Sequence, residues 1–338
     1  MKKIWHICFK TQDEVFFRSH ADHNYFFNGL GSALVKTDSL LYAEAEMSNH
    51  CHQVVSSSNV EELVRLERMS YNKYFNNKYF RKGPLGEPGF FSMEIDGVCH
   101  FLAAIVYTVR NSVHHGVTKT PFMYPYCSAN CFFRKELGKS SIHASQGYER
   151  QGLTVDQLLP TEKIKDYLPR RAEYKKGWHM TTEGVFLRES VIETKLVETN
   201  FVTPQAFLYM MSRRSSEEWR REQEERDHNA KGAITLEKIE DHSFSYINRG
   251  HTQNNKTEEE RDAEKQLSRM LENEKGHFSP PQITDLTICE IIDNQYVPKF
   301  KKGSVYCLSR QEKESIANDV YKKYHPRLSQ IRRCLAMK

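Results

Sequence analysis

The sequence predicts an α+β fold, in which a ferredoxin-like antiparallel sheet with helices is followed by a mainly helical, charged C-terminal extension. Two observations predict it. Strand-like and helix-like hydrophobic periodicities alternate through residues 1–115 in the order β-α-β-β-α-β-α. Over the whole chain of 338 residues, 28% are charged and 38% are hydrophobic, which indicates one packed core with long polar extensions.

Four short apolar segments bounded by turn residues predict the strands, at residues 3–10, 39–46, 50–56 and 90–95. The first helix is predicted at residues 20–37, where apolar residues recur at helical spacing. Asn59 is a good N-cap for a second helix that continues to Tyr79. Asp96 is placed to cap a third helix running through residues 99–110. The first six of these elements have the order of a ferredoxin-like layer.

The amino-acid composition changes after the predicted sheet and helices of residues 1–115, and this change predicts three domains. We expect residues 1–135 to form the first domain, 136–280 a charged helical extension or linker, and 281–338 a basic helical tail. Within the extension, the mixed-sign runs 213–228 and 256–275 predict solvated helices or partly disordered linkers, and residues 279–281 a boundary.

The basic tail resembles the start of a helix-turn-helix, with helices predicted at residues 309–323 and 328–337. The given sequence ends where a recognition helix would begin. We therefore expect a partial motif in which Arg332 and Arg333 contact phosphates rather than read bases.

The charge distribution indicates a polyanionic partner. The formal net charge is only +5, but residues 299–338 hold eleven basic and three acidic residues. A basic tail on a near-neutral body is typical of nucleic-acid binding; the alternative is a tail that only aids solubility. No segment has the roughly 18–20 apolar residues of a membrane span, and no signal peptide is recognised. With eight scattered cysteines and no CxxC pair, we expect reduced thiols in the cytoplasm.

Residues 47–52, M-S-N-H-C-H, carry the most informative pattern. On a strand, residues two apart project from the same face, so His50 and His52 would present two imidazoles side by side while Cys51 turns to the other face. Two such imidazoles can bind one divalent cation. The alternative is two histidines on an exposed strand.

Tyr107 and Asn111 form a second pattern at i and i+4 of the third predicted helix. Both side chains would point the same way, one turn apart. The phenol would then lie beside a metal held by the two histidines and Asn111; alternatively, Tyr107 is half-buried packing.

The second predicted helix interleaves basic and aromatic residues. Its basic side chains can neutralise phosphates while exposed rings stack on unpaired bases. The alternative is that the rings belong to the core. The predicted DNA-binding residues here are Arg65, Arg68, Tyr71, Lys73, Tyr74, Lys78, Arg81 and Lys82.

Taken in order, these patterns resemble the single-tyrosine HUH transposases, and within them the REP-associated tyrosine transposases. The motifs that carry the resemblance are M-S-N-H-C-H at 47–52, Y-N-K-Y-F-N at 71–76 and Y-T-V-R-N-S-V-H-H-G at 107–116. Ser48 and Ser112 stand where the family pattern has proline, and Cys51 replaces a larger apolar residue. The resemblance covers a little over a third of the chain.

The resemblance implies a metal-dependent transposase that cleaves and rejoins single-stranded, hairpin-associated DNA. Tyr107 would form a 5′-phosphotyrosine, with Mg²⁺ or Mn²⁺ held by His50, His52 and Asn111. It implies that residues 1–135 form an HUH endonuclease domain, working as a monomer or homodimer. Two alternatives stay open: a related HUH nickase of the replication or relaxase type, and a non-catalytic, domesticated hairpin-binding protein.

Overall fold

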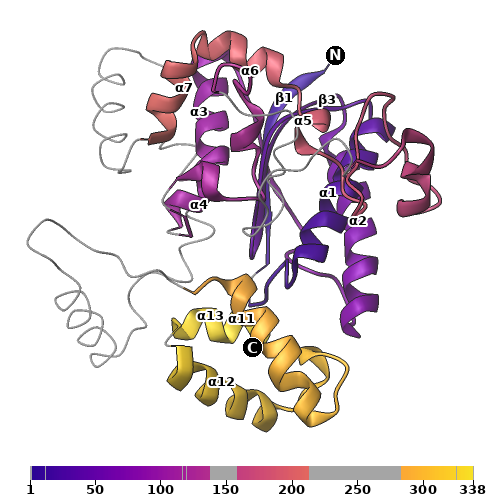
Figure 1. The fold of residues 1–338 in the computed structure, drawn as a ribbon, viewed down its shortest axis with the longest axis vertical. Helices are drawn as coiled ribbons and strands as arrows, with labels where there is room; N and C mark the ends of the chain where they lie inside the picture. Colours follow the sequence, from indigo (N-terminus) through magenta and orange to yellow (C-terminus); the bar gives the residue numbers. More distant parts are fainter. Residues whose placement is uncertain are drawn as a thin grey trace, which may run out of the picture.

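A four-stranded antiparallel sheet forms the centre of the molecule (Figure 1). The computed structural model describes residues 2–137, 158–212 and 283–337, apart from the single positions 12, 116, 119 and 325. The strand order is β2-β3-β1-β4, which is that of a ferredoxin-like layer. The strands are β1 (Lys3–Lys10), β2 (Leu40–Met47), β3 (His50–Ser57) and β4 (Phe91–Glu94).

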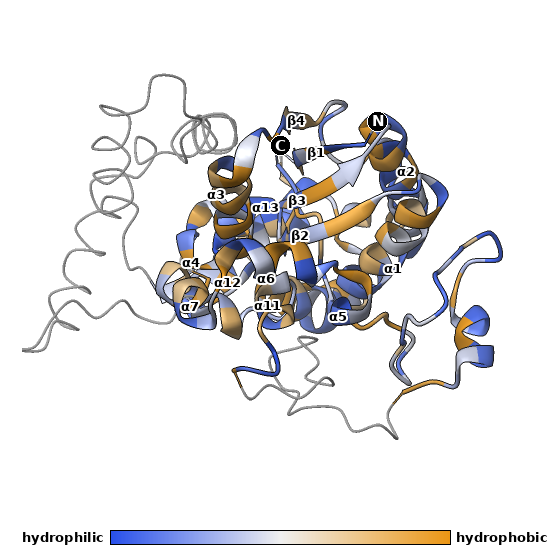
Figure 2. Ribbon diagram, turned by 90° about the horizontal axis from the view of Figure 1, so that it is seen from above, coloured by the Kyte–Doolittle hydropathy of each residue, from blue (hydrophilic) through white to orange (hydrophobic). Residues whose placement is uncertain are grey.

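Helices α1 (His20–Lys36) and α2 (Val60–Tyr79) pack together on one face of the sheet, and α3 (Gly97–Val109) covers the other (Figure 1). Helix α2 begins as predicted, because the Asn59 side chain accepts a hydrogen bond from the Glu62 N–H at 3.0 Å. Helix α3 is apolar over most of its length, as a helix packed on a sheet should be (Figure 2). The predicted α+β fold is therefore confirmed.

The pairing of β1 with β3 decides which side chains share a face. His52 lies directly opposite Cys8, and His6 lies opposite Val54. Side chains alternate along a strand, so His50 and His52 lie on the α3 side. Cys51 and Gln53 lie on the other side, where Gln53 donates a hydrogen bond to Glu67 of α2.

Residues 158–212 pack as part of the same core, so this portion of the predicted extension is not a linker. Buried apolar residues from Ile164 to Met211 join the cluster formed by the sheet and its helices. The segment holds a 3-10 helix at Thr161–Tyr167 and the short helices α5 (Arg188–Val191), α6 (Thr194–Phe201) and α7 (Pro204–Ser212). The runs 213–228 and 256–275 and the boundary at 279–281 lie outside the described residues.

The C-terminal residues form a small helical unit with its own apolar core. It lies below one end of the sheet in Figure 1, and Val15 of the β1–α1 loop belongs to its core. Its helices are α11 (Asp285–Ile291), α12 (Arg310–Tyr324) and α13 (Leu328–Cys334), which confirms a helical C-terminal part. In the described part of the chain, no helix is both long and apolar enough to cross a membrane.

Candidate functional site

The α3 face of the sheet brings Tyr107, His50, His52 and Asn111 into one buried cluster. The Tyr107 ring packs edge-on against His52, with 5.1 Å between ring centroids. Helix α3 ends at Val109, and Asn111 begins the short helix α4 (Asn111–His114). Despite this break, Asn111 Oδ1 lies 2.7 Å from His50 Nε2. The two patterns found 55 or more residues apart in the sequence therefore meet across the helix–sheet interface.

His50 is held at both ring nitrogens. Its Nδ1 lies 2.9 Å from Asn49 Oδ1, and its Nε2 faces Asn111. Burial lowers the pKa of His50 to about 4, an effect larger than the opposing hydrogen bond from Asn111. A neutral imidazole carries one N–H, so one of the two amides must turn its NH₂ group toward the ring. His50 thus keeps an unprotonated nitrogen at neutral pH, as a metal ligand requires.

His52 contacts two residues of β1 that sequence reasoning missed. Its Nδ1 lies 3.2 Å from His6 Nε2, and its Nε2 lies 3.7 Å from Cys8 Sγ. His6 also packs edge-on against Tyr107, with ring centroids 5.7 Å apart. Burial lowers the pKa of His6 to about 3 and that of His52 well below its usual value. The period-2 alternation of β1 places residues 6 and 8 on one face, but only the β1–β3 register reveals which face.

Further imidazoles border this cluster. The His115 ring centroid is 4.9 Å from that of His50, and the His114 ring centroid is 6.4 Å from that of Tyr107. His114 is exposed, whereas His115 is partly buried and desolvation lowers its pKa well below the usual range. His115 is therefore neutral at pH 7, so the ring that packs against His50 carries no charge.

Two of the three predicted metal ligands, His50 and Asn111, are spaced to bind one cation, whereas His52 is not oriented toward them. His50 Nε2 and Asn111 Oδ1 are 2.7 Å apart, close to the roughly 3 Å between neighbouring ligands of a small octahedral ion. His52 lies beside them, with its ring centroid 5.1 Å from that of His50, but its nitrogens face His6 and Cys8. Among the described residues, no three His, Cys, Asp or Glu side chains are arranged to hold a metal.

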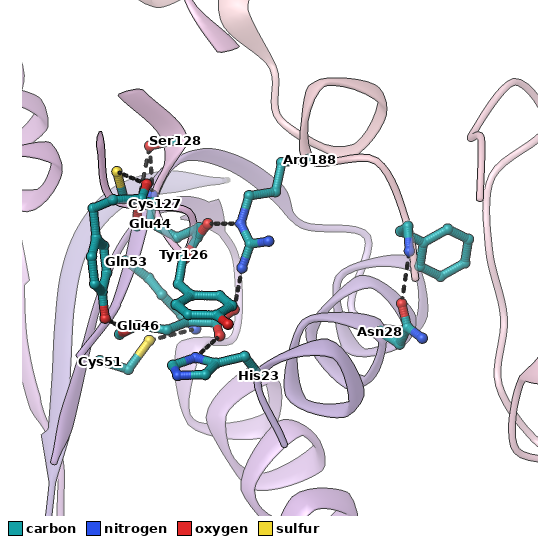
Figure 3. A network of polar contacts seen from close by, with 12 residues as sticks. His23, Asn28, Glu44, Glu46, Cys51, Gln53, Tyr126, Cys127, Ser128 and Arg188 are labelled. Atoms are coloured by element: carbon teal, nitrogen blue, oxygen red, sulfur yellow. Dashed lines mark hydrogen bonds and ion pairs between the residues drawn. The ribbon is translucent and has the colours of Figure 1, made fainter. Parts of the chain in front are cut away.

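The opposite face of the sheet holds a buried charged network (Figure 3). Arg188 of α5 donates to Glu44 at 2.6 Å and to Glu46 at 2.8 Å, and all three side chains are fully buried. Burial raises the pKa of Glu46 well above its usual value, while the charge of Arg188 opposes that shift. His23 of α1 lies 2.8 Å from Glu46. The network ties residues 158–212 to β2, and no sequence pattern marked Arg188.

The two predicted base-stacking rings are taken up by packing, which corrects that prediction. Tyr71 is 1% exposed, and its hydroxyl donates to the Phe16 carbonyl at 2.5 Å. Tyr74 stacks on Tyr25 with 3.9 Å between centroids, and its hydroxyl donates to Asp22. Their helical spacing matches the amphipathic face of α2, so hydrophobic burial takes precedence.

The predicted phosphate-binding residues of α2 and the tail divide into two groups. One group is engaged within the protein: Arg68 with carbonyls of residues 85–89, Lys78 with Asp22, Arg81 with Glu14, and Arg333 with Asp285. The other group is exposed: Arg65, which pairs with Glu62, together with Lys73, Lys82 and Arg332.

Comparison with known proteins adds little to this picture. No protein-family model matches the chain, and no curated protein matches it. A solved structure of a REP-associated tyrosine transposase bound to a REP hairpin is similar to 46% of this chain and 94% of its own, at 12% sequence identity and a TM-score of 0.34. At that TM-score the likeness assigns no activity to this chain.

Proposed function

We propose that this protein is a metal-dependent transposase that cleaves and rejoins single-stranded, hairpin-associated DNA through a 5′-phosphotyrosine on Tyr107. The observation that carries the proposal is the contact of the Tyr107 ring with His52, on the sheet face that also holds His50 and Asn111. The proposed nucleophile and the proposed metal ligands thus share one buried cluster. Two alternatives, the nickase and the non-catalytic binder, are separated from this function by the assays below.

The chemistry follows from the residue types. Tyr107 Oη would lose its proton to water as it attacks the scissile phosphorus, forming an O–P bond while the P–O3′ bond breaks, and the departing 3′ oxygen would take up a proton from water. Reversal by a 3′-OH would join a new end. The phosphotyrosine linkage conserves the free energy of the phosphodiester bond that was broken. Strand transfer therefore needs no nucleotide cofactor. The chain accordingly has no G-x-x-x-x-G-K-[ST] motif.

Tyr107 needs assistance, since a phenol with a pKa near 10 is a weak nucleophile at neutral pH. We propose that His50 and Asn111 hold a divalent ion, with His52 as the third ligand. Bound there, Mg²⁺ or Mn²⁺ would polarise the scissile phosphate and stabilise its developing charge. On ligand softness, a site rich in imidazole suits Mn²⁺ better than Mg²⁺.

The test uses hairpin DNA with single-stranded flanks, labelled at one end and incubated with the full chain and Mn²⁺. We expect label on the 3′ side of the cut to remain with the protein on a denaturing gel, and label on the 5′ side to be released. Tyr107→Phe should abolish the adduct, because it removes the nucleophilic oxygen. Tyr74→Phe is the matched control, since Tyr74 lies on the other face of the sheet.

Other outcomes of the same assay point to the alternatives. Hairpin binding without an adduct across many substrates would indicate the non-catalytic binder. An adduct that never rejoins to a second DNA end would indicate a nickase. An adduct that persists in Tyr107→Phe would rule out Tyr107 as the nucleophile.

The metal assignment predicts a separate effect of His50→Ala. Losing this ligand should abolish cleavage and weaken Mn²⁺ binding, measured by calorimetry without DNA, while hairpin affinity stays near normal. His100→Gln provides a control, because His100 is a buried histidine of α3 that accepts a hydrogen bond from the Asp96 N–H. Cleavage by His50→Ala at the wild-type rate would refute the metal site.

A further inference from the structure

The C-terminal helical unit reaches the turn that leads into His50. Ser48 and Asn49 connect β2 to β3, and His50 is the first residue of β3. The Ser48 hydroxyl donates a hydrogen bond to Asp285 Oδ2 at 2.7 Å. Asp285 begins α11, so residues 237 positions apart in the chain join here.

Asp285 is itself held in place by α13. Arg333 donates to its Oδ2 from Nε at 3.0 Å and from Nη2 at 2.8 Å. Gln330 donates to its Oδ1 at 2.9 Å. Both carboxylate oxygens of Asp285 accept hydrogen bonds, and only 6% of the residue is exposed. These contacts fix its rotamer. The acceptor that Ser48 meets is therefore preorganised.

The β1–α1 loop holds the other side of the same turn. The backbone N–H of Phe16 donates to the Ser48 carbonyl at 2.6 Å, and that of Thr11 donates to the Asn49 carbonyl at 2.8 Å. This loop also carries Arg18, which is fully buried and pairs with Asp293 at 2.9 and 2.8 Å. The C-terminal unit thus fixes both the turn and the loop packed against it.

This turn also orients His50, the proposed metal ligand. Asn49 Oδ1 lies 2.9 Å from His50 Nδ1, and the opposite nitrogen of the same ring faces Asn111 at 2.7 Å. We propose that Asp285 is a positioning residue, which fixes the Ser48–Asn49 turn and through it the ring of His50. Residues 283–337 are then a structural part of the candidate site, in addition to any contact they make with DNA.

Ser48→Ala tests this proposal, because it removes one hydroxyl and leaves the Asp285–Arg333 pair intact. The first readout is the ring ¹⁵N and ¹³C resonances of His50 in histidine-labelled protein, which do not depend on activity. We expect them to shift in Ser48→Ala and in Asp285→Asn, and to return toward wild-type values in Ser48→Thr, which restores a hydroxyl. The matched control is Tyr306→Phe, which removes a different hydroxyl bond between the same units, to Glu14.

The second readout rests on the proposed function. Loss of one hydrogen bond to a charged group should lower kcat for adduct formation about fivefold to tenfold, with hairpin Kd and Tm nearly unchanged. Unchanged His50 resonances in both Ser48→Ala and Asp285→Asn would overturn the positioning role, whatever the activity. If those resonances shift but the wild-type protein forms no adduct, the positioning role stands and the proposed function fails.

Discussion

At the scale of single residues, Glu67 shows how the buried face of the sheet responds to pH. Its carboxyl is fully buried on α2 and accepts a hydrogen bond from Gln53 Nε2 at 2.6 Å. Burial raises its pKa from 4.5 to about 8, an effect larger than the opposing hydrogen bond from Gln53. The folded protein therefore holds a proton on Glu67 that the unfolded chain releases above pH 4.5. Its contribution to stability is complete below pH 4.5 and is lost as pH rises through 8.

Glu67→Gln should remove this dependence, because the amide keeps an acceptor for Gln53 and cannot ionise. We expect the variant to gain free energy of unfolding relative to the wild type as pH rises from 5 to 8.5, by up to a few kcal/mol. Urea denaturation across this range measures the difference, with the more exposed Glu62→Gln as control. Parallel pH profiles for Glu67→Gln and the wild type would contradict the raised pKa.

The residues of the candidate site divide by the kind of information that predicts them. His50 and His52 share a face because strand alternation is local. The spacing of Tyr107 and Asn111 predicts that they lie on one helix, but they lie on two, α3 and α4, which meet at Arg110. His6 and Cys8 join them only through the pairing of β1 with β3, across more than 40 residues. Arg188 comes from a segment 142 residues beyond Glu46. No local sequence pattern predicts contacts between residues so far apart in the chain.

At the scale of elements, the strands and long helices could be predicted because their signals are local. The predicted strands 3–10 and 50–56 match β1 and β3 to within one residue. The Asn59 cap forms as expected, whereas Asp96 stands at the N-cap of α3 without a side-chain capping bond. Apolar contacts with the sheet are enough to define α3, since most helical stability comes from packing.

Helix α2 and residues 158–212 mark the limit of element-scale prediction. Periodicity identifies one face of α2 as apolar, but an aromatic ring on that face is compatible with either packing or base stacking. Tyr71 packs against Phe16 and Tyr74 stacks on Tyr25, so both rings serve packing rather than base stacking. Their partners lie outside α2, so the sequence of the helix alone could not identify them. The helices α5 and α6 have only four and eight residues, too short for a clear periodic signal.

At the scale of the whole molecule, the placement of charge matters more than its sum. Several basic residues predicted to bind DNA neutralise acidic groups within the fold, such as Lys78 with Asp22 at 2.6 Å and Arg333 with Asp285 at 2.8 Å. Arg332 is instead exposed on α13, next to the residue that holds Asp285. Only exposed cations such as Arg332, which are not already paired within the described part of the protein, can release counterions from DNA.

This division predicts how the salt dependence of DNA binding responds to substitution. The logarithm of the hairpin association constant should fall linearly with the logarithm of salt concentration, and Arg332→Gln should reduce the slope by about 1. Lys78→Gln should leave the slope unchanged, because its ammonium group already pairs with Asp22 and also donates to Ser19 and Tyr74. Fluorescence anisotropy titrations at several salt concentrations measure both slopes. If Lys78→Gln lowered the slope as much as Arg332→Gln, the Lys78–Asp22 pair would have to open on binding, and the distinction between paired and exposed cations would be wrong.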